Sequence, residues 1–322
     1  MTTLQPRQES TSSTDSSRAD GLRPARLGDY VSLTKPRIIE LLLITTFPVM
    51  FLAERGIPSV PLVLATLLGG TCAAAGSNVF NCIVDRDIDR LMHRTEDRPL
   101  ATGVISVRAA VIFGTLLTIA SVVILWAFVN ALSAALAFGA VLLYVVFYTM
   151  VLKRRTAQNI VWGGVAGCMP VLIGWSAVTD RVDWAPIVLF LVVFFWTPPH
   201  YWPLSMRFKD DYAAAGVPML PVVAEDSKVA AQVVIYSWVT VLVSLALIPI
   251  APMGWIYTVA AVVSGAVFIA EAHALQRRAK DPANTTLTAI KPMRLFHYSI
   301  SYLTLLFVGV ALDPLFYFPL PL

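Results

Sequence analysis

The chain has 322 residues, of which 57% are hydrophobic and 14% charged, and its formal net charge is +4. Soluble domains contain about 25% charged residues, so this composition excludes a soluble globular protein and indicates an integral membrane protein. The small basic excess does not indicate nucleic-acid binding, because the basic residues are distributed according to the membrane segments described below.

The first 28 residues are polar, rich in serine and threonine, and almost free of large apolar side chains. Such a segment buries too little apolar surface to fold, so we expect a disordered tail over residues 1–28. It lacks the apolar core of a signal peptide, and its acidic residues are atypical of a mitochondrial transit peptide. We therefore expect a bacterial inner-membrane protein with one transmembrane domain over residues 29–322.

Apolar stretches then recur along the chain, each close to the roughly 20 residues that a helix needs to cross a bilayer. They are too long for the strands of an outer-membrane barrel. The sequence therefore predicts an all-α, polytopic membrane protein with about nine transmembrane helices. Their expected bounds are 38–54, 61–84, 109–130, 132–152, 158–178, 184–206, 229–250, 254–275 and 296–316.

The lysines and arginines indicate how these helices are oriented. Of the 24 basic residues, all but Arg55 and Arg181 fall in the N-terminal segment or in every second connection. The positive-inside rule places these segments in the cytoplasm. An odd number of spans then leaves the C-terminus on the opposite side.

A first polar cluster lies at the end of the second apolar stretch, in NVFNCIVDRDIDRLMHRTEDRPL, residues 78–100. Asn81, Asp85 and Asp89 are spaced four residues apart, so on a helix they share one face, and Asp87 points away from it. Charge at the end of a membrane helix is costly and usually functional. Because Mg²⁺ prefers oxygen ligands, this face predicts a magnesium-bound diphosphate. A solvated loop that only obeys the positive-inside rule is the alternative.

Basic residues close to this face supply what a diphosphate needs besides the metal. Arg94 and Arg98 belong to an RTEDRPL segment, and Lys153 to a KRR connection between the fourth and fifth stretches. We expect all three to neutralise phosphate oxygens. For Lys153, a role as a topology anchor is an open alternative. Lys35 and Arg37, just before the first stretch, are weaker candidates for a diphosphate contact, because a residue before a proline at a helix start is ordinary.

A second polar cluster follows the sixth apolar stretch, in TPPHYWPLSMRFKDDYAAAGVPMLPV, residues 197–222. Asp211 is the expected fourth metal ligand, and Arg207 and Lys209 are expected to contact the diphosphate. His200 has three interpretations: a buried hydrogen-bonded residue, an iron ligand or an acid–base group. The two clusters end the second and sixth stretches, which suggests two similar halves that share a central cavity.

The motifs together resemble one family. Asn81, Asp85 and Asp89 followed by RTEDRPL resemble the UbiA superfamily of intramembrane aromatic prenyltransferases. The combination of DRDIDRLMHRTEDRPL, YTMVLKRRTAQNIVWGGVAGCMPVLIGW and WTPPHYWPLSMRFKDDYAAAGVPMLPV is similar to its haem-farnesylating branch, over roughly residues 28–318. Cys82 beside the motif asparagine, and a second cluster without the form DxxYAxxD, depart from the quinone-type relatives and favour that branch.

The resemblance implies a UbiA-type fold in which about nine helices surround a central cavity, with the active-site loops in the cytoplasm. It implies Mg²⁺-dependent transfer of a farnesyl group from farnesyl diphosphate to a vinyl group of haem b. Hydroxylation at that vinyl would give haem O, and haem A synthase or a terminal oxidase would be assembly partners. Asn81, Asp85, Asp89 and Asp211 would surround the metal, and His200 is the residue named for haem binding.

Two other functions remain open at this point. A prenyltransferase that acts on a quinone precursor or on chlorophyllide would share the first motif but not the second. A membrane transporter would also have many helices, but it would place its charges near the bilayer midplane. In this chain the charges cluster at helix ends on one side, which favours the enzyme.

Overall fold

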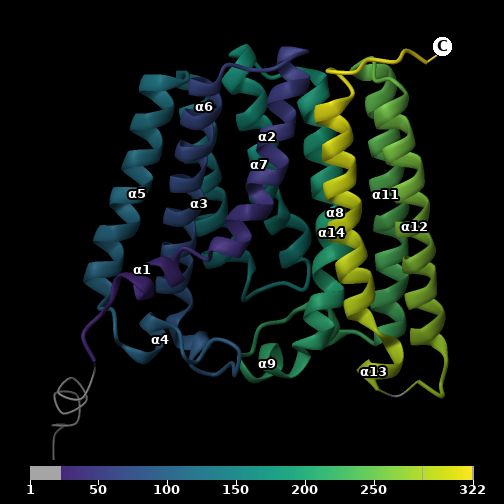
Figure 1. Cartoon of the computed structure of the whole chain (residues 1–322). Coiled ribbons are helices and arrows are strands. Elements are labelled where there is room, and N and C mark those ends of the chain that lie inside the picture. Colours follow the sequence, from purple (N-terminus) through teal and green to yellow (C-terminus); the bar gives the residue numbers. More distant parts are fainter. Residues whose placement is uncertain (1–22, 285, 321–322) are drawn as a thin grey trace, which may run out of the picture.

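The computed structural model describes residues 23–284 and 286–320, and this part of the chain is helical without strands (Figure 1). Most of the expected N-terminal tail, residues 1–22, lies outside the described residues. A short helix, α1 (Leu27–Leu33), starts at the expected end of that tail. Its first turn is closed by Asp29, whose Oδ2 accepts the backbone N–H of Arg26 at 2.8 Å.

The described residues contain nine helices long and apolar enough to cross a membrane, which confirms the predicted number of spans. The chain is therefore a multi-pass membrane protein with the expected all-α fold. The spans are α2 (Pro36–Glu54), α3 (Val60–Asp89), α5 (Val107–Phe128), α6 with η1 (Ala131–Leu142 and Leu143–Leu152), α7 (Asn159–Thr179), α8 (Trp184–Arg207), α11 (Asp226–Ile250), α12 (Trp255–Lys280) and α13 with α14 (Leu287–Ile290 and Pro292–Leu312).

Local sequence signals start several of these helices. Prolines occupy the first turn of α2, α3 and α14, where a missing backbone N–H leaves no hydrogen bond unmade. Ser106 caps α5 by accepting the N–H of Ala109 at 3.2 Å, and Asn130 caps α6 by accepting that of Ser133 at 2.7 Å. These signals are local, which is why the sequence locates the spans to within a few residues.

Small residues allow the helices to approach closely. A Cβ on Gly76 of α3 would lie 2.6 Å from Oγ1 of Thr118 in α5, and a Cβ on Gly174 of α7 would lie 2.6 Å from the carbonyl oxygen of Thr46 in α2. Inside a bilayer, such close packing drives helix association. Consecutive spans pack on one another and α14 returns to α2. In Figure 1, α2 and α7 separate α3, α5 and α6 from α8, α11, α12 and α14.

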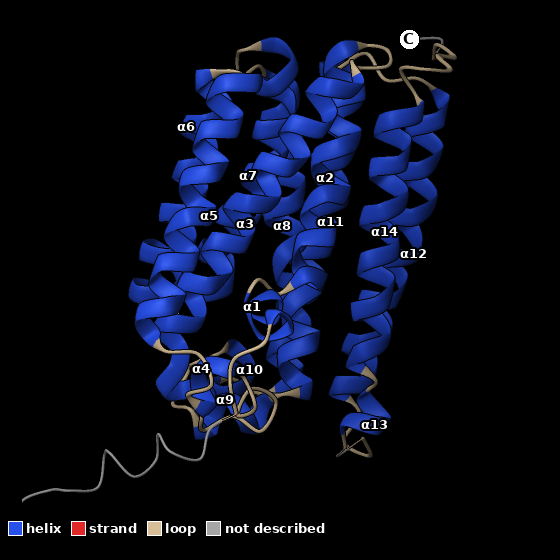
Figure 2. Cartoon of the chain, turned by 60° about the vertical axis from the view of Figure 1, so that its left-hand side comes forward, coloured by secondary structure: helices blue, strands red, loops and turns tan. Residues whose placement is uncertain are grey.

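The two ends of the bundle differ in chemistry. The short helices α1, α4 (Pro99–Thr102), α9 (Lys209–Ala214), α10 (Leu220–Val223) and α13 gather at one end, at the bottom of Figures 1 and 2. We call this the basic end, because the basic connections lie there. At the other end Trp126, Trp184 and Trp255 are 68%, 74% and 49% exposed. Tryptophans at helix ends are typical of a membrane–water interface.

Candidate active site

Helix α3 positions the first polar cluster. It continues to Asp89, beyond the expected bound at residue 84, so Asn81, Asp85 and Asp89 lie on successive turns of one continuous helix. All three side chains are buried, with residue exposures of 3%, 0% and 1%. The predicted helical spacing of these residues is confirmed, and the face they share points into the protein at the basic end.

Asp85 lies at the centre of this cluster. Its Oδ2 accepts a hydrogen bond from Nδ2 of Asn81 at 2.8 Å and forms an ion pair with Nζ of Lys153. Its Oδ1 is buried without a hydrogen-bond partner, and Nη2 of Arg154 is 3.8 Å away. A buried carboxylate oxygen without a hydrogen bond is rare and unfavourable, so this atom marks a position where a ligand would be stabilised.

The π-helical segment η1 brings two more residues to the cluster. Oγ1 of Thr149 accepts a hydrogen bond from Asn81 at 3.1 Å and donates one to the carbonyl oxygen of Tyr144 at 2.8 Å. Lys153 directly follows η1, and its side chain is 11% exposed. Such π-helical turns are rare and frequently occur at functional sites. Lys153 is thus part of the polar cluster, in addition to any effect it has on topology.

The segment after α3 folds back onto the end of the helix. Nη1 of Arg98 donates to both carboxylate oxygens of Asp89, at 2.9 and 2.8 Å, and the carbonyl oxygen of Asp89 accepts the hydroxyl of Thr95 at 3.0 Å. Asp87 lies off the shared face, as expected. Its side chain is 61% exposed and pairs with Arg154 at 2.7 Å. Charge pairs from α3 therefore hold two connections at the basic end: the one after α3, through Arg98, and the one after η1, through Arg154.

Lys35, only a weaker candidate in the sequence, is a member of the cluster. Its Nζ donates a hydrogen bond to Oδ1 of Asn81, and its φ of 53° lies in the left-handed region, which is strained for lysine. Burial of its ammonium group lowers the pKa of Lys35 to about 8. In the sequence, Pro36 after Lys35 is an ordinary helix start and gives no reason to place Lys35 in a site. The one available signal was the position of a lysine directly before the first membrane helix.

The second cluster meets the first through Arg94. Oδ2 of Asp211, which is half-buried, accepts the backbone N–H of Arg94 at 3.3 Å. The guanidinium of Arg94 lies 5.0 Å from the ring centroid of Phe208, and its Nη2 is 3.5 Å from the hydroxyl of Tyr212. That hydroxyl is 3.2 Å from the hydroxyl of Tyr201 in α8. Helix α9 therefore covers the loop that follows α3.

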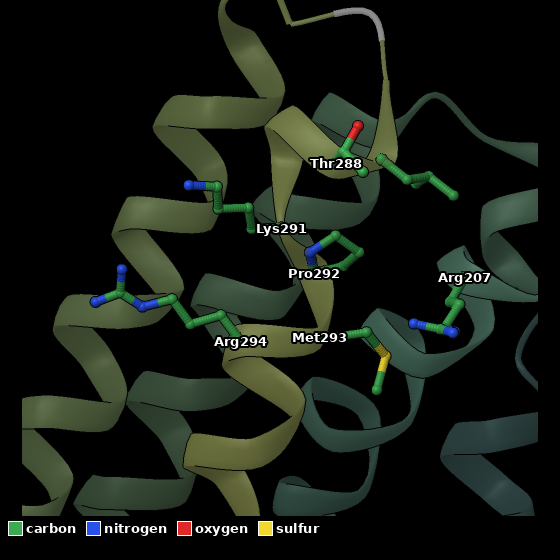
Figure 3. Close-up of a pocket in the computed structure, with 7 residues that line it drawn as sticks. Arg207, Thr288, Lys291, Pro292, Met293 and Arg294 are labelled. Atoms are coloured by element: carbon green, nitrogen blue, oxygen red, sulfur yellow. The ribbon is translucent and has the colours of Figure 1, made fainter.

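Two basic residues that the sequence assigns to the diphosphate lie elsewhere. Helix α8 ends at Arg207 and α9 begins at Lys209, so Arg207 and Asp211 do not share a continuous helix. Nζ of Lys209 is 3.9 Å from Oδ1 of Asp226 at the start of α11. Arg207 is exposed and lines a pocket of about 280 Å³ with residues of α13 and α14 (Figure 3). Neither residue reaches the cluster around Asp85.

His200 lies in an aromatic stack between α8 and α14. Its ring centroid is 4.2 Å from that of Trp196 and 4.7 Å from that of Phe296. Its Nδ1 is 2.7 Å from Oγ of Ser299, and that hydroxyl donates to the carbonyl oxygen of Phe296, also at 2.7 Å. Because a serine hydroxyl has one proton, Nδ1 of His200 must be the donor to Oγ. The lone pair of this imidazole is therefore on Nε2.

The described residues contain no group of three or more histidine, cysteine or carboxylate side chains close enough to hold a metal ion. Asp85 and Asp89 are instead paired with bases, and Asp211 is on another helix. The donor set nevertheless suits Mg²⁺, which binds carboxylate and amide oxygens. Oδ1 of Asp85, buried and without a hydrogen bond, is an available oxygen ligand. The residues therefore fit a divalent cation, provided that Lys153 and Arg98 move to new anionic partners.

Comparison with known proteins identifies the family of the chain. The chain matches the UbiA prenyltransferase family over residues 42–300. A protein of Streptomyces avermitilis named protoheme IX farnesyltransferase is 61% identical over 303 residues, covering 94% of this chain and 98% of that protein. A protein of the same name from Streptomyces coelicolor is 59% identical over 290 residues, covering 90% and 91%.

Solved structures at lower identity share the fold. A digeranylgeranylglyceryl phosphate synthase superposes with a TM-score of 0.70 at 20% identity, over 88% of this chain and 98% of that one. A UbiA homologue from Archaeoglobus fulgidus bound to GPP and Mg²⁺ has a TM-score of 0.62 at 20% identity, over 88% and 99%. The expected UbiA-type fold is thus confirmed. The chain belongs to the UbiA prenyltransferase family and, within it, groups with the protohaem IX farnesyltransferases.

Proposed function

We propose that this protein transfers the farnesyl group of farnesyl diphosphate to a vinyl group of haem b. The observation that carries the proposal is 61% identity, over 94% of the chain, to a protein named protoheme IX farnesyltransferase. That name gives the prenyl group and its acceptor. Hydroxylation at the same vinyl, with haem O and diphosphate as products, is the finer part of the proposal.

The diphosphate binds at the α3 cluster. Asn81, Asp85, Asp89 and Asp211 would hold Mg²⁺, which when bound stabilises the charge of the leaving diphosphate. A UbiA homologue of the same fold was solved with GPP and Mg²⁺, which supports this choice. The bases bind phosphate oxygens through charge-assisted hydrogen bonds, which are the strongest in proteins. We assign this role to Lys35, Arg94, Arg98 and Lys153.

The reaction needs an allylic cation that is kept from water until it has reacted. The C–O bond to diphosphate breaks and the electron pair stays with the diphosphate, which Lys153 and Arg98 neutralise. The haem vinyl group then attacks the farnesyl carbon. Water adds at the vinyl carbon beside the ring, and a proton is lost. Tyr144 and Tyr148 of η1, with ring centroids 5.5 Å apart, offer aromatic faces to the cation and exclude water near Asp85.

Haem b binds on the α8–α14 side, with His200 as the candidate iron ligand. The hydrogen bond from Nδ1 to Ser299 leaves the Nε2 lone pair available, which is the state that an iron ligand requires. The stack with Trp196 and Phe296 fixes the ring. In the competing interpretation, His200 only joins α8 to α14 through the same contacts. The two interpretations are distinguished by measuring the affinities for haem b and for farnesyl diphosphate separately in a His200 variant.

We place the basic end in the cytoplasm of a bacterial inner membrane, following the positive-inside rule. Haem A synthase or a terminal oxidase would then be assembly partners. Reporter fusions test the orientation. Fusions in the connections after α3, η1, α8 and α12 should report cytoplasm, and fusions at the other end and at the C-terminus should report the opposite side. A cytoplasmic C-terminus would contradict the proposed topology.

The direct test is to incubate the purified protein with haem b, farnesyl diphosphate and Mg²⁺ and to analyse the porphyrin by mass. We expect a product heavier than haem b by one farnesyl group and one hydroxyl group. A chelator should abolish its formation, and added Mg²⁺ should restore it. If the protein instead prenylates 4-hydroxybenzoate and leaves haem unchanged, it acts on a quinone precursor and the proposed acceptor is wrong.

A further inference from the structure

A second feature of the bundle is a groove between the first half of α12 and the middle of α14, which opens sideways to the bilayer and has Tyr298 toward the basic end. Its volume is about 320 Å³. It is apolar with a few hydroxyl groups, and its walls include Ala260, Val263 and Ser264 of α12 and Tyr298, Ser301 and Leu305 of α14. The groove is long enough for a segment of hydrocarbon chain. It includes neither residues of the α3 cluster nor His200 and its aromatic stack, so it is distinct from the two regions assigned to the substrates.

Basic side chains border the end of this groove. Arg294 lies with its guanidinium carbon 5.8 Å from the ring centroid of Tyr298, which is a groove residue. Lys291 lies one turn before Arg294 and makes no ion pair within the described residues. Both residues also line the pocket that contains Arg207, although in Figure 3 their side chains extend to the side away from Arg207. Residues 294, 298, 301 and 305 are spaced by three or four, so they form one face of α14, and Lys291 directly precedes the helix.

The local charge remains positive after all ion pairs are counted. Two acidic groups lie at this corner: Asp281, exposed at the end of α12, and Glu271, which is buried with a side-chain exposure of 7%. It pairs with Arg278 at 2.8 Å and with Arg294 at 3.1 Å. One carboxylate thus faces two arginines, and Lys291 adds a further positive charge. Arg277 and Lys280, both exposed on the last turn of α12, increase the positive field.

We propose that this groove binds an anionic phospholipid, with an acyl chain between α12 and α14 and the headgroup phosphate at Lys291 and Arg294. The combination fits an amphiphile that carries negative charge at its interfacial end. The groove faces the bilayer, where phospholipid is the most concentrated amphiphile, so we commit to a lipid rather than to a substrate. Each basic residue near an anionic headgroup contributes about a fivefold gain in affinity.

The test compares binding of phosphatidylglycerol and phosphatidylcholine with identical acyl chains to the full-length protein, by native mass spectrometry. The wild type should prefer phosphatidylglycerol by about fivefold or more. Lys291→Gln should remove most of that preference. Lys280→Gln is the matched control, because it deletes an exposed basic charge on the last turn of α12 that is not assigned to the headgroup phosphate, and it should change the preference much less than Lys291→Gln. Arg294→Gln, which also removes a partner of Glu271, serves only as a second measurement.

The apolar part of the groove is tested separately. Ser301→Trp should fill it and weaken the binding of both lipids, whereas Leu116→Trp on the exposed face of α5 should not. Equal binding of the two lipids by the wild type, or an unchanged preference in Lys291→Gln, would overturn the proposal. Displacement of phosphatidylglycerol by haem b or farnesyl diphosphate would also overturn it, because the groove would then be a substrate site. None of these outcomes depends on whether haem is farnesylated.

Discussion

The two polar clusters at the basic end differ in how they are held, although each follows the end of a membrane helix. In the first, Asp85 and Asp89 are buried and paired with Lys153 and Arg98. In the second, Asp211 is half-buried and accepts one backbone N–H at 3.3 Å. Asp85 and Asp89, which are buried and paired with bases, therefore stabilise the fold as well as serve the chemistry. Asp211, with one weak contact, serves the chemistry and adds little to stability.

The difference originates in the helices themselves. Helix α3 continues without interruption to Asp89, so one rigid element sets the positions of its polar residues. Helix α8 contains Pro198, Pro199 and Pro203 near its end and stops at Arg207, before the short helix α9. Internal prolines remove backbone hydrogen bonds and bend or end helices. The second cluster therefore has more freedom to rearrange when a ligand binds.

The largest effect is expected for Asp85→Asn. Activity should fall at least about a hundredfold, because the substitution removes a charge that acts on the developing diphosphate. Stability should also fall, by about 3–5 kcal/mol, because Lys153 stays buried without its partner. The double variant Asp85→Asn/Lys153→Gln should regain stability but not activity. Turnover assays and thermal unfolding of the purified protein measure the two effects.

Asp87→Asn is the control for this prediction. Its carboxylate is 61% exposed and lies off the shared face, so activity should stay close to that of the wild type. Full turnover in Asp85→Asn, or equal losses in Asp85→Asn and Asp87→Asn, would show that the face of α3 has no special role.

A smaller effect is expected for Asp211→Asn. Activity should fall about 10-fold to 100-fold if the residue helps to hold the metal. Stability should change by less than about 0.5 kcal/mol, because the side chain is half-exposed and makes a single weak contact. Asp210→Asn, an exposed neighbour, is the control and should behave as the wild type. A marked loss of stability in Asp211→Asn would mean that Asp211 contributes to the fold as Asp85 and Asp89 do.

A pH dependence of diphosphate binding is expected from Lys35. Its pKa of about 8 means that the free protein holds a charged ammonium below pH 8 and a neutral amine above it. A neutral amine attracts phosphate less, so affinity should fall by at most about tenfold between pH 7 and pH 9. Lys35→Arg, which stays charged, should flatten this profile. Titration calorimetry at several pH values measures it, and an unchanged profile in Lys35→Arg would exclude Lys35 as the titrating group.

The smallest effect is expected for Arg207→Gln and Lys209→Gln. A lost charged hydrogen bond to phosphate costs about 1.5–3 kcal/mol, or roughly 10-fold to 100-fold in affinity. In the structure both residues lie outside the Asp85 cluster, so we expect a loss of less than about threefold. Arg98→Gln should show the full effect in the same binding assay. Losses in Arg207→Gln that match those in Arg98→Gln would show that the second cluster closes onto the diphosphate.

The sequence predicts the structural features that depend on residues close together along the chain. The nine spans follow from the lengths of apolar runs, and the shared face of Asn81, Asp85 and Asp89 follows from helical geometry. These features need no knowledge of tertiary structure, because the periodicity of one helix defines them.

What the sequence could not predict depends on residues that are distant along the chain. Lys35 meets Asn81 across 46 positions, and His200 meets Ser299 across 99. The π-helical turns of η1 have no recognised sequence signal, yet they position Thr149 and the residue after η1. The break after α8 likewise moves Arg207 away from Asp211, although their spacing fits one helix. Such contacts are set by packing between helices.

The central claim is that the two regions serve different substrates, the α3 cluster the diphosphate and the α8–α14 side the haem. The most direct measurement is of both binding constants, for farnesyl diphosphate with Mg²⁺ and for haem b, in two variants. Asp85→Asn/Lys153→Gln removes the centre of the first region, and His200→Phe keeps the aromatic stack but removes the ring nitrogens. We predict that each variant loses affinity for one substrate and retains it for the other. Loss of both affinities together in a folded variant would contradict the account.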